Sequence, residues 1–207
     1  MILVGQYDSP FVRRVAISLR VLGFGYEHDT RSVFGDFDAM RKVNPLARIP
    51  SLVLDDGEVL SDSIAILDWL DETVGPSHAL LPRSGVKRRR ALQRIALAIG
   101  AVDKAGASAY ERLIRPPAYR WVGWIERCRT QAAGAIAALG AMEWPEDAKL
   151  DQVQITTACM LRYLQMTDPE LLPRGRYPAL DALSARCEAR PEFQATFPAD
   201  VVYPKSG

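Results

Sequence analysis

In the first 75 positions, apolar residues recur in two patterns: the alternation typical of a β-strand and the spacing typical of a helix. Short alternating or β-branched runs predict three strands, at Ile2–Val4, Tyr26–Thr30 and Leu52–Leu54. The pair Asp56-Gly57 predicts a tight turn into a fourth strand at Val59–Leu60. The last two strands are therefore expected to form a hairpin.

Helical spacing fills the intervals between these strands. A first helix is predicted to end at Gly23, a second covers about Phe37–Val43, and a third begins at Ser61 or Asp62 and ends before Gly75. The order of elements is then βαβαββα, a parallel β-α-β unit followed by a hairpin and a final helix. The apolar positions of the first helix are Val12, Val15, Ala16, Leu19 and Leu22.

After Gly75-Pro76 no further segment has the pattern of a strand, and every later segment with periodic apolar residues has helical spacing. The pattern therefore divides the chain into an α/β domain at residues 1–75, a linker at 76–85 and an all-α helical bundle at 86–207. The apolar segments of the bundle are Leu92–Val102, Trp121–Leu139, Ile155–Leu164 and Pro178–Cys187, the last stopping before Pro191.

Composition narrows the possible partners. The 207 residues include 48% hydrophobic and 25% charged residues, which is ordinary for a globular protein. With 26 basic and 25 acidic residues, no overall field favours nucleic acid or an anionic membrane. No apolar run reaches the roughly 18 residues of a membrane span, and the first residues lack the features of a secretory signal. A cytoplasmic protein with no nucleic-acid or membrane partner is expected.

The three cysteines, Cys128, Cys159 and Cys187, are widely spaced, odd in number and set in helical patterns. This arrangement indicates buried, reduced thiols, with neither a disulfide framework nor a metal site.

Ser9-Pro10 stands where the first strand gives way to the first helix. Serine is a favoured N-cap and proline suits the first helical position. The capping hydroxyl still has a proton to donate, and the helix start is electropositive, so both can stabilise a thiolate. Lowering a thiol pKa by about two units requires roughly 2.7 kcal/mol, which one hydrogen bond to a charged group, at about 1.5–3 kcal/mol, largely supplies. Serine as a nucleophile is less favoured, because His28 and His78 lie outside any nucleophile-elbow context.

Two further motifs follow in the same domain. Taken by itself, Ile49-Pro50 indicates a proline in the loop before the third strand, and its peptide bond is then expected to be trans. Ser61-Asp62-Ser63 is typical of a helix start. It is also suited to an amino acid: Asp62 to an ammonium group, and Ser63 with the free helix N–H groups to a carboxylate.

Together, SPFVRR, NPLARIPSLVLDDG and LSDSIAILDWLDE resemble the N-terminal domain of the glutathione S-transferase family in order and spacing, specifically bacterial members with an active-site serine. The resemblance covers nearly the whole chain. It implies a thioredoxin-like first domain, a cis Ile49-Pro50 bond, an all-α substrate-binding domain and a homodimer. It further implies that Ser9 activates the thiol of glutathione, that the backbone of Ile49 pairs with the cysteinyl unit, and that Asp62 and Ser63 hold the γ-glutamyl end. Arg48 either meets a glutathione carboxylate or is a solvated loop residue.

The chain departs from the family pattern in three places. Asp151 and Gln154 replace the usual Ser/Thr and Asp at the start of a buried helix, and they retain the chemistry of a capping box. Asp62 replaces a glutamate. Position 9 is not cysteine and no Cys-x-x-Cys occurs, which excludes dithiol chemistry.

The resulting hypothesis is a glutathione transferase that conjugates glutathione to a small apolar electrophile or reduces peroxides. Tyr7, Phe11 and Tyr110 are candidates to line the electrophile pocket. One alternative is a non-catalytic dimeric binding or regulatory protein on the same fold. Another is a glutathione-dependent isomerase or dehalogenase of one metabolite. The basic run Lys87–Arg90 is interpreted as a solvated helix face.

Overall fold

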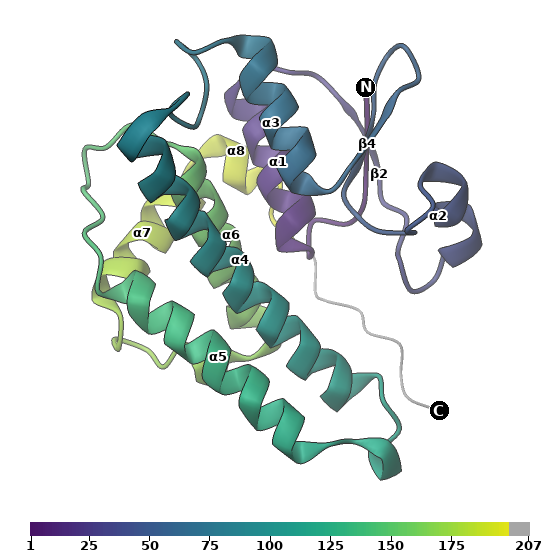
Figure 1. Ribbon diagram of the computed structural model, residues 1–207, viewed down its shortest axis with the longest axis vertical. Coiled ribbons are helices and arrows are strands. Elements are labelled where there is room, and N and C mark those ends of the chain that lie inside the picture. Colours follow the sequence, from purple (N-terminus) through teal and green to yellow (C-terminus); the bar gives the residue numbers. More distant parts are fainter. Residues whose placement is uncertain (199–207) are drawn as a thin grey trace. The chain divides into compact units, whose positions relative to one another are not determined.

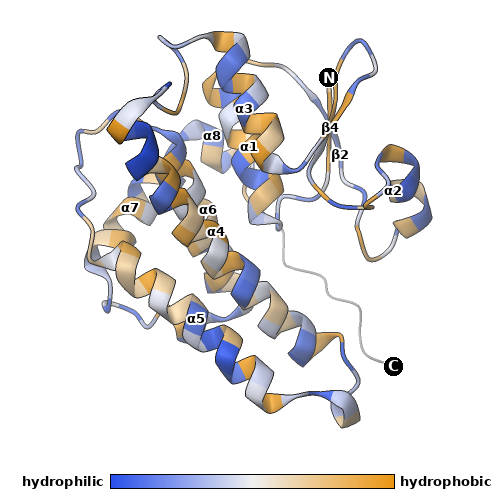
Figure 2. Ribbon diagram, in the orientation of Figure 1, coloured by the Kyte–Doolittle hydropathy of each residue, from blue (hydrophilic) through white to orange (hydrophobic). Residues whose placement is uncertain are grey.

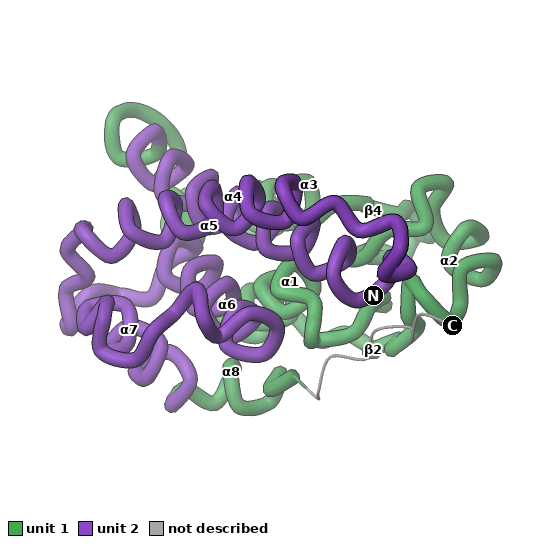
Figure 3. Tube along the Cα trace, turned by 90° about the horizontal axis from the view of Figure 1, so that it is seen from below, with its two compact units in different colours: residues 1–88, 190–199 green, residues 89–189, 200–207 purple. Residues whose placement is uncertain are grey.

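The structure is a computed structural model that describes residues 1–198 (Figure 1). It separates into two compact units (Figure 3). The first unit contains Met1–Arg88 and the segment that begins at Arg190, and the second contains Arg89–Ala189.

A four-stranded sheet forms the centre of the first unit. Its strands are β1 (Ile2–Val4), β2 (Glu27–Asp29), β3 (Ser51–Val53) and β4 (Val59–Ser61), in the spatial order β2-β1-β3-β4. β1 pairs with β2 in parallel and with β3 antiparallel, and β3 pairs antiparallel with β4. The predicted parallel unit and hairpin are both confirmed, and with them the thioredoxin-like fold.

Helices α1 (Pro10–Val21) and α3 (Ser63–Val74) pack against each other, while α2 (Phe37–Val43) connects β2 to β3. The predicted order βαβαββα is therefore confirmed. The apolar faces of α1 and α3 meet residues of the sheet, because strands this short cannot bury enough apolar surface alone. The buried residues of this core are Leu3, Val12, Val15, Ala16, Leu19, Leu52, Ile66, Leu67 and Leu70.

The second unit is helical, as predicted, and α6 is its most buried helix. The capping box at the start of α6 is confirmed: Asp151 accepts the backbone N–H of Gln154 at 2.9 Å, and the Gln154 side chain accepts the N–H of Asp151 at 3.1 Å. The helices are α4 (Gly85–Leu113, whose first turns also belong to the first unit), α5 (Val122–Gly140), α6 (Gln152–Thr167) and α7 (Pro178–Glu188). Short 3₁₀ turns lie at Pro117–Tyr119 and Pro169–Leu171. Figure 2 shows the early turns of α4 in blue, where the sequence has its basic run.

One helix was not predicted. α8 (Pro191–Gln194) contacts α1 in the first unit. Arg13, on α1 and only 1% exposed, donates to the carbonyls of Phe193 at 3.1 Å and Thr196 at 3.0 Å. A helix of four residues is too short to show periodicity, and its partner lies 180 residues earlier in the chain.

The three cysteines are buried, as predicted, and among the described residues none of them forms a disulfide. Between residues 1 and 198, no helix is long and apolar enough to cross a membrane. The same residues contain no group of three or more His, Cys, Asp or Glu side chains arranged to hold a metal ion.

Candidate functional site

The strand register brings three loops to one end of the sheet. Val4 of β1 lies opposite Ser51 of β3, and Ser51 lies opposite Ser61 of β4. β1 and β4 both end at this row and β3 begins there, so the segments that continue from the row share one end of the sheet. These segments carry the three motifs singled out in the sequence, Ser9-Pro10, Ile49-Pro50 and Ser61-Asp62-Ser63.

Direct packing holds two of these loops together. Gly5 has a φ of +126°, and a Cβ placed on it would lie 2.7 Å from Cβ of Ile49 and 2.6 Å from Cγ2 of Val12. The loop after β1 can thus approach the loop before β3 only because residue 5 is glycine. Sequence reasoning missed this position, although a glycine directly after a strand is a signal of close backbone approach.

Ser9 is the N-cap of α1, as predicted. The backbone N–H of Val12 donates to Ser9 Oγ at 3.4 Å, and Pro10 takes the first helical position. No group within the described residues accepts the proton of the Ser9 hydroxyl. The half-buried Ser9 hydroxyl, at the start of α1, therefore has a proton available to donate to another group.

Tyr7 presents the other hydroxyl of this loop, and that hydroxyl has a partner inside the domain. The phenol oxygens of Tyr7 and Tyr26 are 2.8 Å apart. The Tyr7 ring stacks on the ring of His28, with centroids 3.9 Å apart and planes 10° from parallel. Burial, and then the hydrogen bond to Tyr26, raise the pKa of the Tyr7 phenol, which keeps it neutral.

Asp8 lies between these two residues and was not recognised in the sequence. Burial raises the pKa of its carboxyl above the ordinary value of 3.8, while a hydrogen bond from the backbone N–H of Ser9 acts in the opposite direction. A carboxylate next to Ser9 thus carries a desolvation cost when it is ionised.

The Ile49-Pro50 bond is cis, as the resemblance implied. The buried side chain of Asn44 organises the loop before it, a role the sequence did not reveal. Its amide nitrogen donates to the carbonyl of Arg48 at 2.9 Å and to Ser51 Oγ at 2.7 Å, and its amide oxygen accepts the N–H of Arg48 at 3.3 Å. Within residues 1–198 the backbone N–H and C=O of Ile49 have no hydrogen-bond partner. The Arg48 side chain is exposed.

Asp62 and Ser63 form the start of α3. Asp62 has a φ of +75°, is exposed, and accepts the N–H of Ile64 at 2.9 Å. The N–H of Asp62 donates to the carbonyl of Pro50 at 3.3 Å, so this helix start adjoins the cis proline. Ser63 is buried, and its Oγ accepts a hydrogen bond from Arg14 Nη2 at 2.6 Å.

The candidates for the electrophile pocket belong to two different units. Phe11 is partly buried, with the Arg14 guanidinium 5.9 Å from its ring centroid. Tyr110 lies on α4 in the second unit and is 48% exposed. The pocket therefore stays a prediction.

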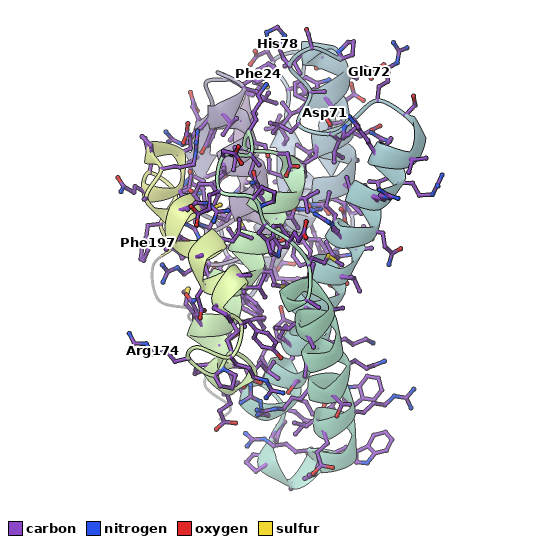
Figure 4. All side chains as sticks on the ribbon, turned by 90° about the vertical axis from the view of Figure 1, so that its left-hand side faces the viewer. Phe24, Asp71, Glu72, His78, Arg174 and Phe197 are labelled. Atoms are coloured by element: carbon purple, nitrogen blue, oxygen red, sulfur yellow. The ribbon has the colours of Figure 1, made fainter. Side chains whose placement is uncertain are left out.

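A cavity of about 450 Å³ opens elsewhere in the first unit, between α3 and the segment that follows it. Asp71 and Glu72 line it and are labelled in Figure 4. The Asp71 carboxylate accepts the N–H groups of Leu80 at 2.7 Å and Leu81 at 3.1 Å. Arg88 pairs with Asp68 at 3.4 Å, so three of the charged residues that line this cavity make contacts within the unit.

Comparison with known proteins agrees with this geometry. The family model of the glutathione S-transferase N-terminal domain matches residues 3–78. The GST-like protein YibF of Escherichia coli is 31% identical over 167 residues, which is 79% of this chain and 82% of YibF. A probable maleylacetoacetate isomerase of Vibrio cholerae is 28% identical over 219 residues, covering 96% of this chain and 95% of the relative.

Among solved structures, a glutathione transferase family member from Pseudomonas fluorescens Pf-5, with bound glutathione, is 35% identical. It superimposes with a TM-score of 0.84 over 96% of this chain and 98% of its own. The chain described here therefore belongs to the glutathione S-transferase family.

Proposed function

We propose that the protein binds glutathione at the end of the sheet formed by the three loops, and that Ser9 stabilises the glutathione thiolate for attack on an electrophile. The observation that carries this proposal is the convergence of these loops on a helix start whose serine hydroxyl has an uncommitted proton. The related protein from Pseudomonas fluorescens, which was crystallised with glutathione, supports it.

Each loop has a role in the proposal. Glutathione is an extended peptide, so its cysteinyl unit would pair with the unpartnered backbone N–H and C=O of Ile49, as a strand pairs with an open edge. The exposed carboxylate of Asp62 would hold the γ-glutamyl ammonium group, and the start of α3 at Ser63 would hold the carboxylate. Arg48, exposed beside Ile49, would meet the carboxylate at the other end of the peptide.

The chemistry requires no general base. The thiol proton leaves to solvent, and the Ser9 hydroxyl donates to the sulfur while the positive end of α1 adds its field. The thiolate then forms a carbon–sulfur bond with an apolar electrophile, either displacing a leaving group or adding to an activated double bond that takes up a proton from solvent. With a hydroperoxide, the thiolate attacks an oxygen, the O–O bond breaks and the alkoxide takes up a proton and leaves as an alcohol. The glutathione sulfenic acid that remains condenses with a second glutathione to give the disulfide and water. Tyr7 has no role in thiol activation in this proposal, because its hydroxyl is hydrogen-bonded to that of Tyr26.

Calorimetric titration of glutathione into the protein and into Asp62→Asn tests the binding site. Asparagine keeps the capping oxygen and tolerates a positive φ, so this substitution removes the charge with little effect on the helix start. We expect micromolar to low millimolar affinity in the wild type and a loss of about tenfold in the variant. Asp38→Asn, at an exposed position on α2, is the matched control. If the wild type gives no heat and no thermal stabilisation, the enzyme proposal fails and the dimeric binding protein is favoured.

A second candidate is glutathione-dependent isomerisation. It is favoured by the maleylacetoacetate isomerase relative, which matches this chain over 96% of its length. In an isomerase the thiolate adds to a conjugated double bond and leaves again, so glutathione is regenerated. Measuring glutathione consumption per turnover separates the two: one equivalent indicates conjugation, and none, with isomerised maleylacetoacetate as the product, indicates isomerisation.

A further inference from the structure

His28, on β2, contacts the loop that carries Ser9 at two points. Its Nε2 lies 2.7 Å from the carbonyl oxygen of Gly5, and its ring stacks on that of Tyr7. A carbonyl oxygen only accepts hydrogen bonds, so Nε2 carries a proton and donates it. Gly5 and Tyr7 both belong to the loop between β1 and α1, and the proposed function gives His28 no role.

The hydrogen bond to Gly5 lies where the pairing of β1 with β2 ends. The N–H of Gly5 donates to the carbonyl of Asp29 at 2.8 Å and extends the parallel pairing by one residue. In a regular parallel ladder the carbonyl of Gly5 would then accept the N–H of Arg31. That N–H donates instead to Asp29 Oδ1 at 3.1 Å. The side chain of His28 therefore supplies the donor that the neighbouring backbone does not.

Gly5 depends on such a contact because glycine restricts its own backbone very little. Its φ of +126° is one of many conformations open to it. A peptide unit is planar, so a hydrogen bond to the carbonyl of Gly5 also orients the amide of Gln6. The carbonyl of Gln6 in turn accepts the N–H of Ser9 at 3.2 Å. His28 is thus connected to the N-cap of α1 through the backbone of the loop.

The ring stack restrains the same loop at a second position. The centroids of the Tyr7 and His28 rings are 3.9 Å apart, and the Tyr7 hydroxyl also lies 2.8 Å from that of Tyr26. Tyr26 directly precedes β2, so both partners of Tyr7 come from the same strand segment. The loop is therefore held at Gly5 and again at Tyr7 before it reaches Ser9.

We propose that His28 is a positioning residue for Ser9: by holding the carbonyl of Gly5 and the ring of Tyr7, it fixes the loop that directs the Ser9 hydroxyl toward the sulfur of glutathione. This inference rests on the proposed function, in which that hydroxyl donates to the thiolate. A hydrogen bond to a charged group is short and directional, so a small displacement of the donor weakens it. His28 acts through Ser9 and does not itself contact the ligand.

The pKa of the glutathione thiol in the complex, followed by thiolate absorbance, tests the proposal. His28→Phe keeps an aromatic ring for Tyr7 but has no donor for Gly5. We expect it to raise the thiol pKa by about half a unit to one unit, less than Ser9→Ala does, because the hydroxyl is displaced but still present. His28→Gln keeps an N–H donor and should recover part of the difference.

A double variant shows whether His28 acts through Ser9. If it does, adding His28→Phe to Ser9→Ala leaves the thiol pKa at the value of Ser9→Ala alone, because no hydroxyl remains to be positioned. If His28→Phe does not fold, His28→Asn takes its place in both backgrounds, because its amide is one methylene shorter than that of glutamine and does not reach Gly5.

Gly57→Ala is the control for a purely structural effect. Gly57 lies in the turn between β3 and β4, its φ is +90°, and nothing lies within 4 Å of an added Cβ. The substitution should lower stability through backbone strain and leave the thiol pKa at the wild-type value.

The outcomes separate this inference from the proposed function. A wild type that does not bind glutathione, or an unchanged thiol pKa in Ser9→Ala, refutes both. If Ser9→Ala raises the thiol pKa and His28→Phe does not, the role of His28 is overturned and that of Ser9 stands. The role of His28 is also overturned by a further rise in the double variant, by no recovery in His28→Gln, or by an equal rise in Gly57→Ala.

Discussion

The phenol oxygen of Tyr7 lies 2.8 Å from that of Tyr26, and Ser9, two residues further on, keeps a hydroxyl proton with no acceptor in the described chain. Two hydroxyl groups in one loop are thus assigned different roles by their surroundings. Arg20 Nε also donates to Tyr26 at 3.3 Å, so the tyrosine pair belongs to a network within the domain.

Replacing each hydroxyl separately tests this assignment. Ser9→Ala should lower turnover at saturating glutathione by about tenfold to a hundredfold, since a hydrogen bond to a charged group is worth about 1.5–3 kcal/mol. Its affinity for glutathione should change little. Tyr7→Phe should retain turnover within about twofold and lose about 1 kcal/mol of unfolding free energy with its hydrogen bond. Steady-state kinetics and urea unfolding measure both, and a Tyr7→Phe variant as inactive as Ser9→Ala would refute the assignment.

Gly5→Ala should destabilise the fold, because its Cβ would overlap both Val12 and Ile49 and its φ of +126° is strained for alanine. We expect a loss of about 2 kcal/mol or more in unfolding free energy, from overpacking and backbone strain combined. Gly57→Ala is the control: its φ is +90°, but nothing lies within 4 Å of the added Cβ. Thermal unfolding of the two variants separates overlap from strain, and equal losses would contradict the close approach.

Arg13→Gln should release the α8 segment from α1. The arginine is buried and donates to Phe193 and Thr196, and glutamine cannot reach both carbonyls. Removing buried hydrogen bonds from a charged group typically costs about 2–4 kcal/mol. Hydrogen exchange of residues 191–196 should speed up more than that of α3. Uniform acceleration throughout the first unit would show that Arg13 acts on the whole domain instead.

Asp8→Asn should stabilise the protein at neutral pH. Because burial raises the pKa of Asp8 above 3.8, the folded protein favours the neutral acid. Stability is therefore lost as the pH rises from 3.8 through the raised pKa, and the ionised form carries the cost above it. Asparagine avoids this cost and can still accept the N–H of Ser9. Urea unfolding should give the variant an advantage at pH 7 that disappears well below pH 3.8, whereas an advantage independent of pH would exclude desolvation as the cause.

The sequence predicted those parts of the fold that depend on local periodicity and capping. The βαβαββα order, the four long helices and the capping box of Asp151 and Gln154 all follow from residues close together in the chain. The site motifs at Ser9, Pro50 and Asp62 were recognisable for the same reason.

Features that depend on contacts between distant segments were not predictable. Arg14 meets Ser63 across 49 residues and Arg13 meets Phe193 across 180, and both arginines resemble ordinary polar positions of an amphipathic helix. Strand register, which places Val4, Ser51 and Ser61 in one row, likewise becomes visible only in the folded sheet.

The central claim is that Ser9 stabilises the thiolate of bound glutathione. The most direct test is a pH titration of thiolate absorbance near 240 nm for glutathione bound to the wild type and to Ser9→Ala. We predict that the wild type lowers the thiol pKa by about one to two units from its usual value near 8.5, and that Ser9→Ala restores most of the difference. Equal thiol pKa values in the two complexes would contradict the account.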